Sequence, residues 1–222
     1  MVGSTWQAFS NAGERTGMDG KSKLFWEFVR VLKETNPTYF LLENVRMKKE
    51  WENIITEQLG VKPILINSRL VSAQNRPRLY WTNIPNIEQP MDCGLVLADI
   101  LEDTWDDKFN LSEKACDYMS RLRNGKPRWE YHTNPLNGKS ACLTANMYKG
   151  VPYGVIKEQL RRLTPVECER LQTVPDNYTA GVSDTQRFKM LGNGWTIDVI
   201  AHILINMKYY EPVITEKQLE LI

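Results

Sequence analysis

One carboxylate, Glu43, stands at a position where a side chain could do chemistry. It directly follows the short apolar run 39–42, which predicts a buried strand. Open α/β sheets place their active sites at the carboxyl ends of parallel strands, so the position favours a functional carboxylate. A surface or ion-paired glutamate that happens to follow a strand is the alternative.

Two groups of basic side chains could contact phosphates. Arg76 and Arg78 flank Pro77, and they either organise a pocket or are surface arginines beside a turn. Residues 121–132 (RLRNGKPRWEYH) mix basic and aromatic side chains, as a DNA-contacting loop would. A solvated positive patch explains this second stretch equally well. Its candidate DNA-binding residues are Arg121, Arg123, Lys126 and Arg128.

The elements that position these residues alternate in the first third of the chain. Helices are predicted over 21–35 and 48–59, and strands over 39–42, 63–70 and 78–83. This order predicts an α/β unit with at least partly parallel pairing. In the first helix the predicted inward face comprises Leu24, Phe25, Phe28, Val31 and Leu32.

The alternation is lost from residue 84 to about residue 157, where short helices over 95–102 and 112–123 lie among turns. Thr164, Pro165 and Glu167 then have the pattern of a capped helix start, and a last helix is predicted over 196–207. We therefore expect three segments: a partial catalytic domain (1–83), an inserted recognition domain (84–160), and a return to the first domain (161–222).

Composition excludes several classes of protein. There are 28 basic and 27 acidic side chains, a net charge of +1, which excludes a polycation but not a local DNA-binding face. No apolar run is long enough for a membrane span, and residues 1–10 do not have the pattern of a secretion signal. The four cysteines are too far apart for metal-ligand pairs, so we expect reduced thiols, no metal site and a cytoplasmic protein.

Four islands in the sequence resemble the DNA cytosine-C5 methyltransferase family. Residues 3–13 (GSTWQAFSNAG) look like the nucleophile loop of that family, Gly-Ser-Pro-Cys-Gln-Gly-Phe-Ser. Residues 43–45 (ENV) and 74–78 (QNRPR) are similar to two further motifs. The fourth island runs from residues 162–165 (RLTP) through 170–172 (RLQ) to 192–194 (GNG). One island alone would be weak evidence, whereas four in order are strong evidence.

The resemblance implies a Rossmann-like S-adenosylmethionine-dependent methyltransferase domain with a small target-recognition domain, and double-stranded DNA as partner. In this chemistry a cysteine adds to C6 of a flipped-out cytosine while a carboxylic acid holds N3 and the amine. C5 then accepts the methyl group of S-adenosylmethionine. By the resemblance Glu43 is the acid, and Arg76 and Arg78 lie near the flipped base and the phosphate backbone. Asn193, Gly194 and Trp195 close one wall of the cofactor site.

The first island departs from the family pattern at the decisive position. Trp6 stands where the family has its cysteine, and an indole cannot form the covalent adduct. None of the remaining cysteines is offered as a substitute, because Cys168 belongs to the helix after Thr164 and the others lie in the insert. Arg15, in a glycine-rich stretch after this island, suits either a loop that closes over DNA or an ordinary turn.

A second departure concerns the cofactor. The resemblance implies a Phe-x-Gly-x-Gly-Gly turn that binds S-adenosylmethionine, and the sequence contains no such turn. We therefore expect an incomplete methyltransferase domain, encoded by a bacterium or a phage, that does not bind the cofactor alone. Three hypotheses follow: a split or truncated homologue that is inactive alone, a DNA-binding regulatory partner of an active enzyme, or a subunit completed by a second chain. An exposed sheet edge would also favour self-association.

Overall fold

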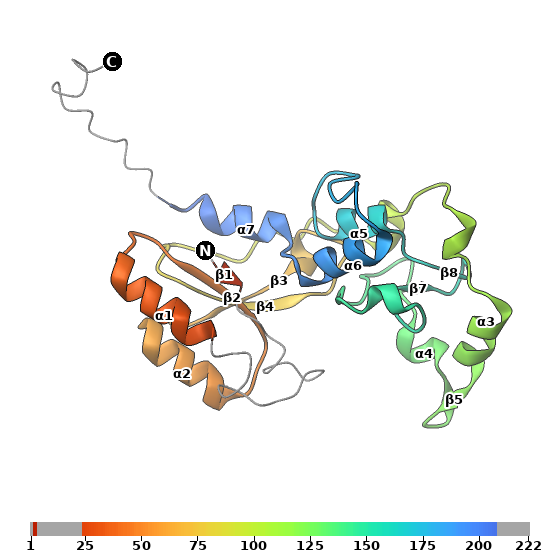
Figure 1. Ribbon diagram of the computed structural model, residues 1–222, viewed down its shortest axis with the longest axis horizontal. Helices are drawn as coiled ribbons and strands as arrows, with labels where there is room; N and C mark the ends of the chain where they lie inside the picture. Colours follow the sequence, from red (N-terminus) through yellow and green to blue (C-terminus); the bar gives the residue numbers. More distant parts are fainter. Residues whose placement is uncertain (1, 4–23, 208–222) are drawn as a thin grey trace, which may run out of the picture.

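The computed structural model describes residues 2–3 and 24–207, which form two lobes joined side by side (Figure 1). One lobe, here called the sheet lobe, holds the four-stranded sheet and helices α1, α2 and α7. The other, here called the second lobe, consists of residues 95–194 and has little regular structure. Within the described ranges, no helix is long and apolar enough to cross a bilayer.

The sheet has the strand order β1-β2-β4-β3. It comprises β1 (Val2–Gly3), β2 (Leu41–Val45), β3 (Ile64–Asn67) and β4 (Pro77–Thr82). Strand β1 runs parallel to β2, whereas β4 is antiparallel to both β2 and β3. The predicted partly parallel α/β unit is therefore confirmed, with a mixed sheet.

Helices cover both faces of this sheet. Helices α1 (Leu24–Thr35) and α2 (Lys49–Leu59) share a core with Leu42, Leu79 and Trp81. Helix α7 (Ile197–Leu204) packs with Leu41, Ile66 and Tyr80. Because side chains alternate between the faces of a strand, the neighbours Leu41 and Leu42 serve opposite cores. Burying both faces explains why β2 is apolar at successive positions.

The inward face of α1 differs from the predicted one. Phe25, Phe28 and Val29 are buried, whereas Leu24 and Val31 are exposed. Positions 25, 28, 29 and 32 follow the i, i+3, i+4, i+7 spacing of one helix stripe, and Leu24 and Val31 fall at its margins. The prediction was therefore wrong for these two residues.

The second lobe is built from short elements. They are η5 (Leu97–Ile100), η6 (Asp107–Phe109), α3 (Glu113–Ser120), β5 (Leu122–Arg123), β6 (Lys126–Pro127), α4 (Trp129–His132), η7 (Met147–Lys149), β7 (Val155–Ile156), β8 (Arg161–Arg162), α5 (Pro165–Leu171) and α6 (Asp184–Asn193). A further turn, η4 (Ser68–Leu70), follows β3. Because Leu97, Phe109, Leu171 and Phe188 belong to one hydrophobic cluster, α5 and α6 share a core with the segment before them.

The start of α5 is fixed as its sequence predicts. Thr164 accepts a hydrogen bond from the backbone of Glu167, and the Glu167 carboxylate accepts one from the backbone of Thr164. Glu167 also pairs with Arg161 at 2.6 Å, with both side chains fully buried. The capping box and this buried ion pair together hold β8 against α5.

Helix α6 does not follow from the predicted elements, and it changes the place of one motif. Residues 192–194 are the last part of the fourth island, and they form the end of a helix that was not predicted: Asn193 ends α6 and Gly194 is its C-cap. Helix α7 begins only at Ile197. Within α6, Gly192 lies against the backbone of Thr144 and Ala145, so closely that a Cβ atom would overlap it. Glycine is therefore required by the close approach of α6 to the backbone of residues 144–145, just before η7.

Replacing Gly192 with alanine should destabilise the protein by about 1–3 kcal/mol, because the added methyl group meets backbone atoms that cannot rotate away. Urea unfolding followed by circular dichroism measures the effect. Gln186→Ala, on the exposed surface of the same helix, is the matched control and should leave the unfolding midpoint nearly unchanged. An unchanged midpoint for Gly192→Ala would contradict the packing described.

Candidate functional site

Glu43 lies inside the sheet lobe and is paired with an arginine. It is the third of the five residues of β2, so its predicted place at the carboxyl end of the strand was wrong by two residues. Its Oε1 atom lies 2.9 Å from Nε of Arg78, and the exposed fractions of the two side chains are 6% and 9%. The structure therefore excludes an exposed glutamate and shows a buried ion pair.

The environment of Glu43 favours its protonated form. Burial raises the pKa of this carboxyl group above its ordinary value, while Arg78, Arg76 and a hydrogen bond from the Trp195 side chain oppose the change. Burial, and then the nearby Glu43 charge, also raise the pKa of Tyr80. A buried carboxyl group that keeps its proton at higher pH than usual is suited to act as a hydrogen-bond donor or general acid.

Arg76 does not face an open pocket but joins the two lobes. One of its terminal nitrogens donates to the carbonyl of Leu143 at 2.8 Å. The other donates to the carbonyls of Gly192 at 3.1 Å and Gly194 at 2.7 Å. The side chain is 2% exposed. A residue next to β4 thus holds two distant parts of the second lobe, and without it the buried carbonyls of Leu143 and Gly192 would lose their guanidinium donor.

Sequence reasoning missed Cys142, which lies beside both arginines. Its Sγ atom is 3.3 Å from Nη1 of Arg76 and 3.7 Å from Nη2 of Arg78. The side chain is half-buried. Cys142 is 99 residues from Glu43 in sequence, and only the folding of residues 140–143 onto Gln74 brings it there. No spacing in the sequence could have indicated this contact.

The proposed cofactor wall is mostly engaged within the protein. The carbonyl of Gly194 accepts from Arg76 and from Gln172, at 2.7 and 3.2 Å. Trp195 packs against the core under α7 and bonds Glu43, and only Asn193 has an exposed side chain. Among the described residues, these three do not provide the donors and the cradle that a nucleotide needs. We therefore derive no step through a cofactor.

The predicted DNA-contacting stretch forms an exposed hairpin of β5 and β6. Its turn, Asn124-Gly125, has positive φ at both residues, as a two-residue hairpin turn requires. Arg121 and Arg123 are exposed, and neither forms an ion pair with another described residue. Lys126 pairs with Glu130 at 3.2 Å. The Arg128 guanidinium stacks on Tyr118 at 4.6 Å. Two of the four candidate cations are therefore free to bind phosphate.

Two predicted residues, Trp6 and Arg15, lie outside the described residues, so the structure does not place them. The same holds for the rest of residues 4–23. No cluster of three or more potential metal ligands occurs in residues 2–3 and 24–207.

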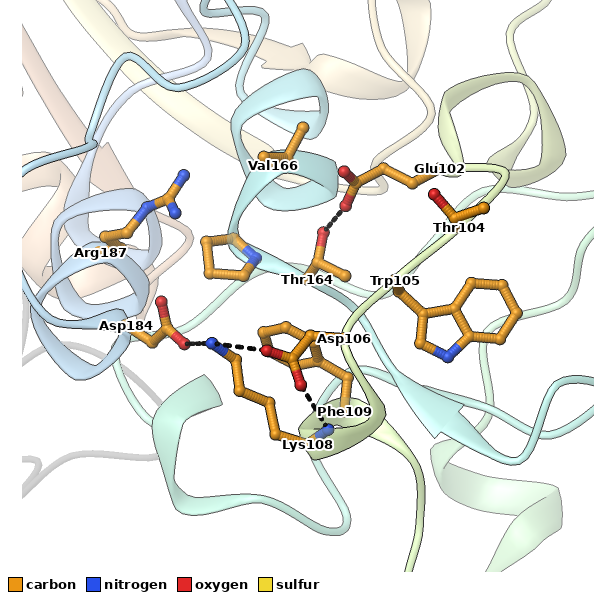
Figure 2. A pocket seen from close by; sticks show the side chains of 11 residues that line it. Glu102, Thr104, Trp105, Asp106, Lys108, Phe109, Thr164, Val166, Asp184 and Arg187 are labelled. Atoms are coloured by element: carbon orange, nitrogen blue, oxygen red, sulfur yellow. Dashed lines mark hydrogen bonds and ion pairs between the residues drawn. The ribbon is translucent and has the colours of Figure 1, made fainter.

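A cavity of about 330 Å³ opens in the second lobe between η6 and α5 (Figure 2). Its charged groups are already satisfied. Lys108 lies 3.0 Å from Asp184 and 3.5 Å from Asp106, and Thr164 donates to Glu102. Arg187 pairs with Glu169 at 2.9 Å. Because each of these charged groups already has a partner within the protein, the geometry of this cavity does not favour a second reaction site.

Replacing Arg76 with lysine should destabilise the protein by at least about 2 kcal/mol, because one ammonium group cannot reach the carbonyls of both Leu143 and Gly192 and leaves a buried acceptor without that donor. Urea unfolding provides the measurement. Arg69→Lys, at an exposed arginine of η4, is the control and should change little. Equal stability of the two variants would show that Arg76 does not join the lobes.

Comparison with known proteins matches nearly the whole chain to one family. The family model described as C-5 cytosine-specific DNA methylase matches residues 3–209. The type II methyltransferase M1.ScrFI of Lactococcus lactis subsp. cremoris is 32% identical over 90% of this chain and 59% of its own length. M.HpaII of Haemophilus parainfluenzae is 29% identical over 87% of this chain and 67% of its own. The chain thus spans less than two thirds of M1.ScrFI.

Solved structures agree on the fold. A methyltransferase of Entamoeba histolytica superposes with a TM-score of 0.69 at 16% identity, covering 94% of this chain and 77% of its own. The Dnmt2 methyltransferase of S. pombe gives 0.63 at 18% identity, with coverages of 92% and 75%. The family uses S-adenosylmethionine as methyl donor. The matched motifs, the sheet order and the buried Glu43–Arg78 pair all lie within the region covered, and this chain belongs to the C-5 cytosine-specific DNA methylase family.

Proposed function

We propose that this chain binds double-stranded DNA as a homologue of cytosine-C5 methyltransferases and does not by itself transfer a methyl group. The observation that carries the proposal is that the acid of the family and its supporting arginines are retained while the nucleophile is replaced. The acid and its supports, Glu43, Arg78 and Arg76, are present and buried together. The position that matches the nucleophile of the family holds Trp6.

The missing nucleophile accounts for the proposed loss of catalysis. C5 of cytosine becomes reactive only after a thiolate adds to C6, and tryptophan offers no group that can add and leave again. An indole is also larger than a thiol, so Trp6 would compete for the space of a flipped base. Removal of a covalent nucleophile lowers rates by several orders of magnitude.

The remaining groups can still hold a base. A protonated Glu43 donates to an acceptor nitrogen of the ring, and an ionised one accepts from an exocyclic amine. Arg78, at 2.9 Å, fixes the orientation of the carboxyl group. Because these contacts need no covalent step, the site supports binding of a flipped cytosine without methylation.

DNA binding is proposed through the second lobe. The hairpin of β5 and β6 projects from that lobe, at the end farthest from the sheet in Figure 1, and presents Arg121 and Arg123. Of the expected division into 1–83, 84–160 and 161–222, we keep the start of the insert at residue 84 and move its end. The common core of α5 and α6 with the insert adds that the recognition module extends to about residue 194.

A second chain is proposed as partner for the free side of β1, because β1 pairs only with β2 in the described sheet. It would be another protein or a second copy of this one, and would make the chain a subunit or a regulatory partner of an active enzyme. Sedimentation of the purified chain, alone and with any co-encoded methyltransferase, tests this. If the chain sediments as a monomer both alone and with the co-encoded methyltransferase, the proposal of a partner chain is refuted.

The purified chain should bind duplex DNA, with an affinity that falls as salt rises, and should transfer no label from methyl-labelled S-adenosylmethionine to that DNA. Fluorescence anisotropy and scintillation counting on the same preparation give both results. Absence of DNA binding at low salt would refute the binding function. Incorporation of label above the protein-free blank would refute the proposed inactivity.

Neutralising the hairpin in the double variant Arg121→Gln, Arg123→Gln should weaken DNA binding and reduce the slope of log K against log salt by up to about 1.8, because each arginine that no longer neutralises a phosphate lowers the slope by roughly 0.9. Anisotropy titrations between low and moderate salt measure the slope. A matched double variant on α1, Arg30→Gln with Lys33→Gln, should keep the wild-type slope. Equal slopes for all three proteins would show that the hairpin does not contact DNA.

A further inference from the structure

A second, smaller cavity shares Lys108, Phe109 and Asp184 with the one in Figure 2. Its volume is about 220 Å³, which is room for a small polyatomic group with its water. None of the residues that form the Glu43 site lines it. Its polar wall consists of Lys108, Tyr148, Arg162, Asp184 and Thr185.

Arg162 is the unusual group in this wall. It is half-buried, and it forms no ion pair with another described residue. Its hydrogen bond to the carbonyl of Met147 is 3.5 Å long, the outer limit for such a bond. By contrast, Arg161, Arg170 and Arg187 of the same lobe each pair with a carboxylate at 2.6–2.9 Å.

The charge of Arg162 is therefore poorly compensated inside the protein. Burial lowers the pKa of its guanidinium, and the attraction of Asp184 offsets this only in part. Asp184 is itself occupied, with Lys108 Nζ at 3.0 Å. Since arginine stays protonated in proteins, such a guanidinium gains most from an anion that enters the cavity and accepts its forked donors.

The rim adds further positive charge. Lys189 Nζ lies 4.9 Å from the centre of the Tyr148 ring, and Lys149 Nζ lies 6.0 Å from it. Asp184 is the carboxylate in the wall, and it opposes an anion, but Lys108 neutralises it. Arg162 and the two rim lysines are thus left to attract a negative group.

We propose that the cavity between Arg162, Lys108 and Tyr148 binds a phosphate group. A planar guanidinium with two parallel donors matches the tetrahedral oxygens of phosphate, and the hydroxyl groups of Thr185 and Tyr148 belong to the same wall. The group is either a phosphodiester of DNA or a free phosphate compound. Binding of a DNA phosphodiester in this cavity rests on the proposed function, whereas binding of a free phosphate compound does not.

Two measurements on the full chain distinguish the sources. In the first, a fluorescent duplex of about 20 base pairs is titrated at several salt concentrations with wild type, Arg162→Gln and Lys33→Gln. Removing one DNA phosphate contact lowers the salt slope of Arg162→Gln by about 0.9, while Lys33→Gln, an equal change of charge on the exposed face of α1, keeps the wild-type slope. In the second, inorganic phosphate is added at constant ionic strength, and the melting temperature is followed.

A slope change in Arg162→Gln identifies the DNA backbone as ligand. A phosphate-dependent rise in melting temperature that wild type shows and Arg162→Gln lacks identifies a free phosphate compound. If wild type and variant have the same salt slope and phosphate raises the melting temperature of neither, the proposal is overturned. If the wild-type protein binds no DNA, the proposed function is refuted. The melting temperature with and without phosphate then still shows whether this cavity binds a phosphate group. If Arg162→Gln does not fold, both measurements are repeated with Lys189→Gln, a variant at the rim. We expect this variant to weaken whichever of the two responses the wild-type protein shows.

Discussion

The guanidinium of Arg76 is the interaction on which the arrangement of this protein depends. It comes from the segment that leads into β4, and it donates to carbonyls of Leu143, Gly192 and Gly194. Those carbonyls belong to two separate stretches of the second lobe. A lysine or a neutral side chain could not satisfy all of them, because they lie on different segments. The forked contact of Arg76 is thus the charged part of the joint between the lobes. Ser72, Gln74 and the buried Ala73 extend this joint toward Leu171 and Ser140.

The candidate site is a consequence of this joint. Residues 140–143 are held near β4 by Arg76 and by Gln74, and this places Cys142 against Arg78. Arg78 in turn pairs with Glu43, so the sheet and the second lobe together exclude water from the carboxyl group. Exclusion of water is what raises the pKa of Glu43 despite two arginines nearby. The contacts of Arg76 and Gln74 that pack the lobes together therefore also help to bury Glu43 and so to raise its pKa.

Local patterns in the sequence predicted most elements of the sheet lobe, but not the contacts between distant segments. The capping box of α5 and the end of α2 at residue 59 are local signals, and the structure confirms them. The strand beside Glu43 was also predicted, but its bounds were not, since β2 includes Glu43. The resemblance of four short motifs predicted the family, which the comparisons show.

Contacts between distant segments could not be inferred in this way. The carbonyl partners of Arg76 and the position of Cys142 depend on groups 66 to 118 residues away, whose types carry no signal. Helix α6 was missed because it is polar on most of its surface and its buried Phe188 and Leu191 give a weak periodic pattern. The buried face of α1 was misplaced for the opposite reason, since apolar residues continue past the stripe that packs.

Differential scanning calorimetry of the wild-type chain tests most directly whether the Arg76 joint makes the two lobes one unit. If it does, the protein unfolds in a single transition whose calorimetric and van't Hoff enthalpies agree. The variant Arg76→Met, with the fork removed, then shows two separate transitions or one broadened one. Two resolved transitions in the wild-type protein would contradict the account, because the lobes would then be stable independently of the contact that forms the site.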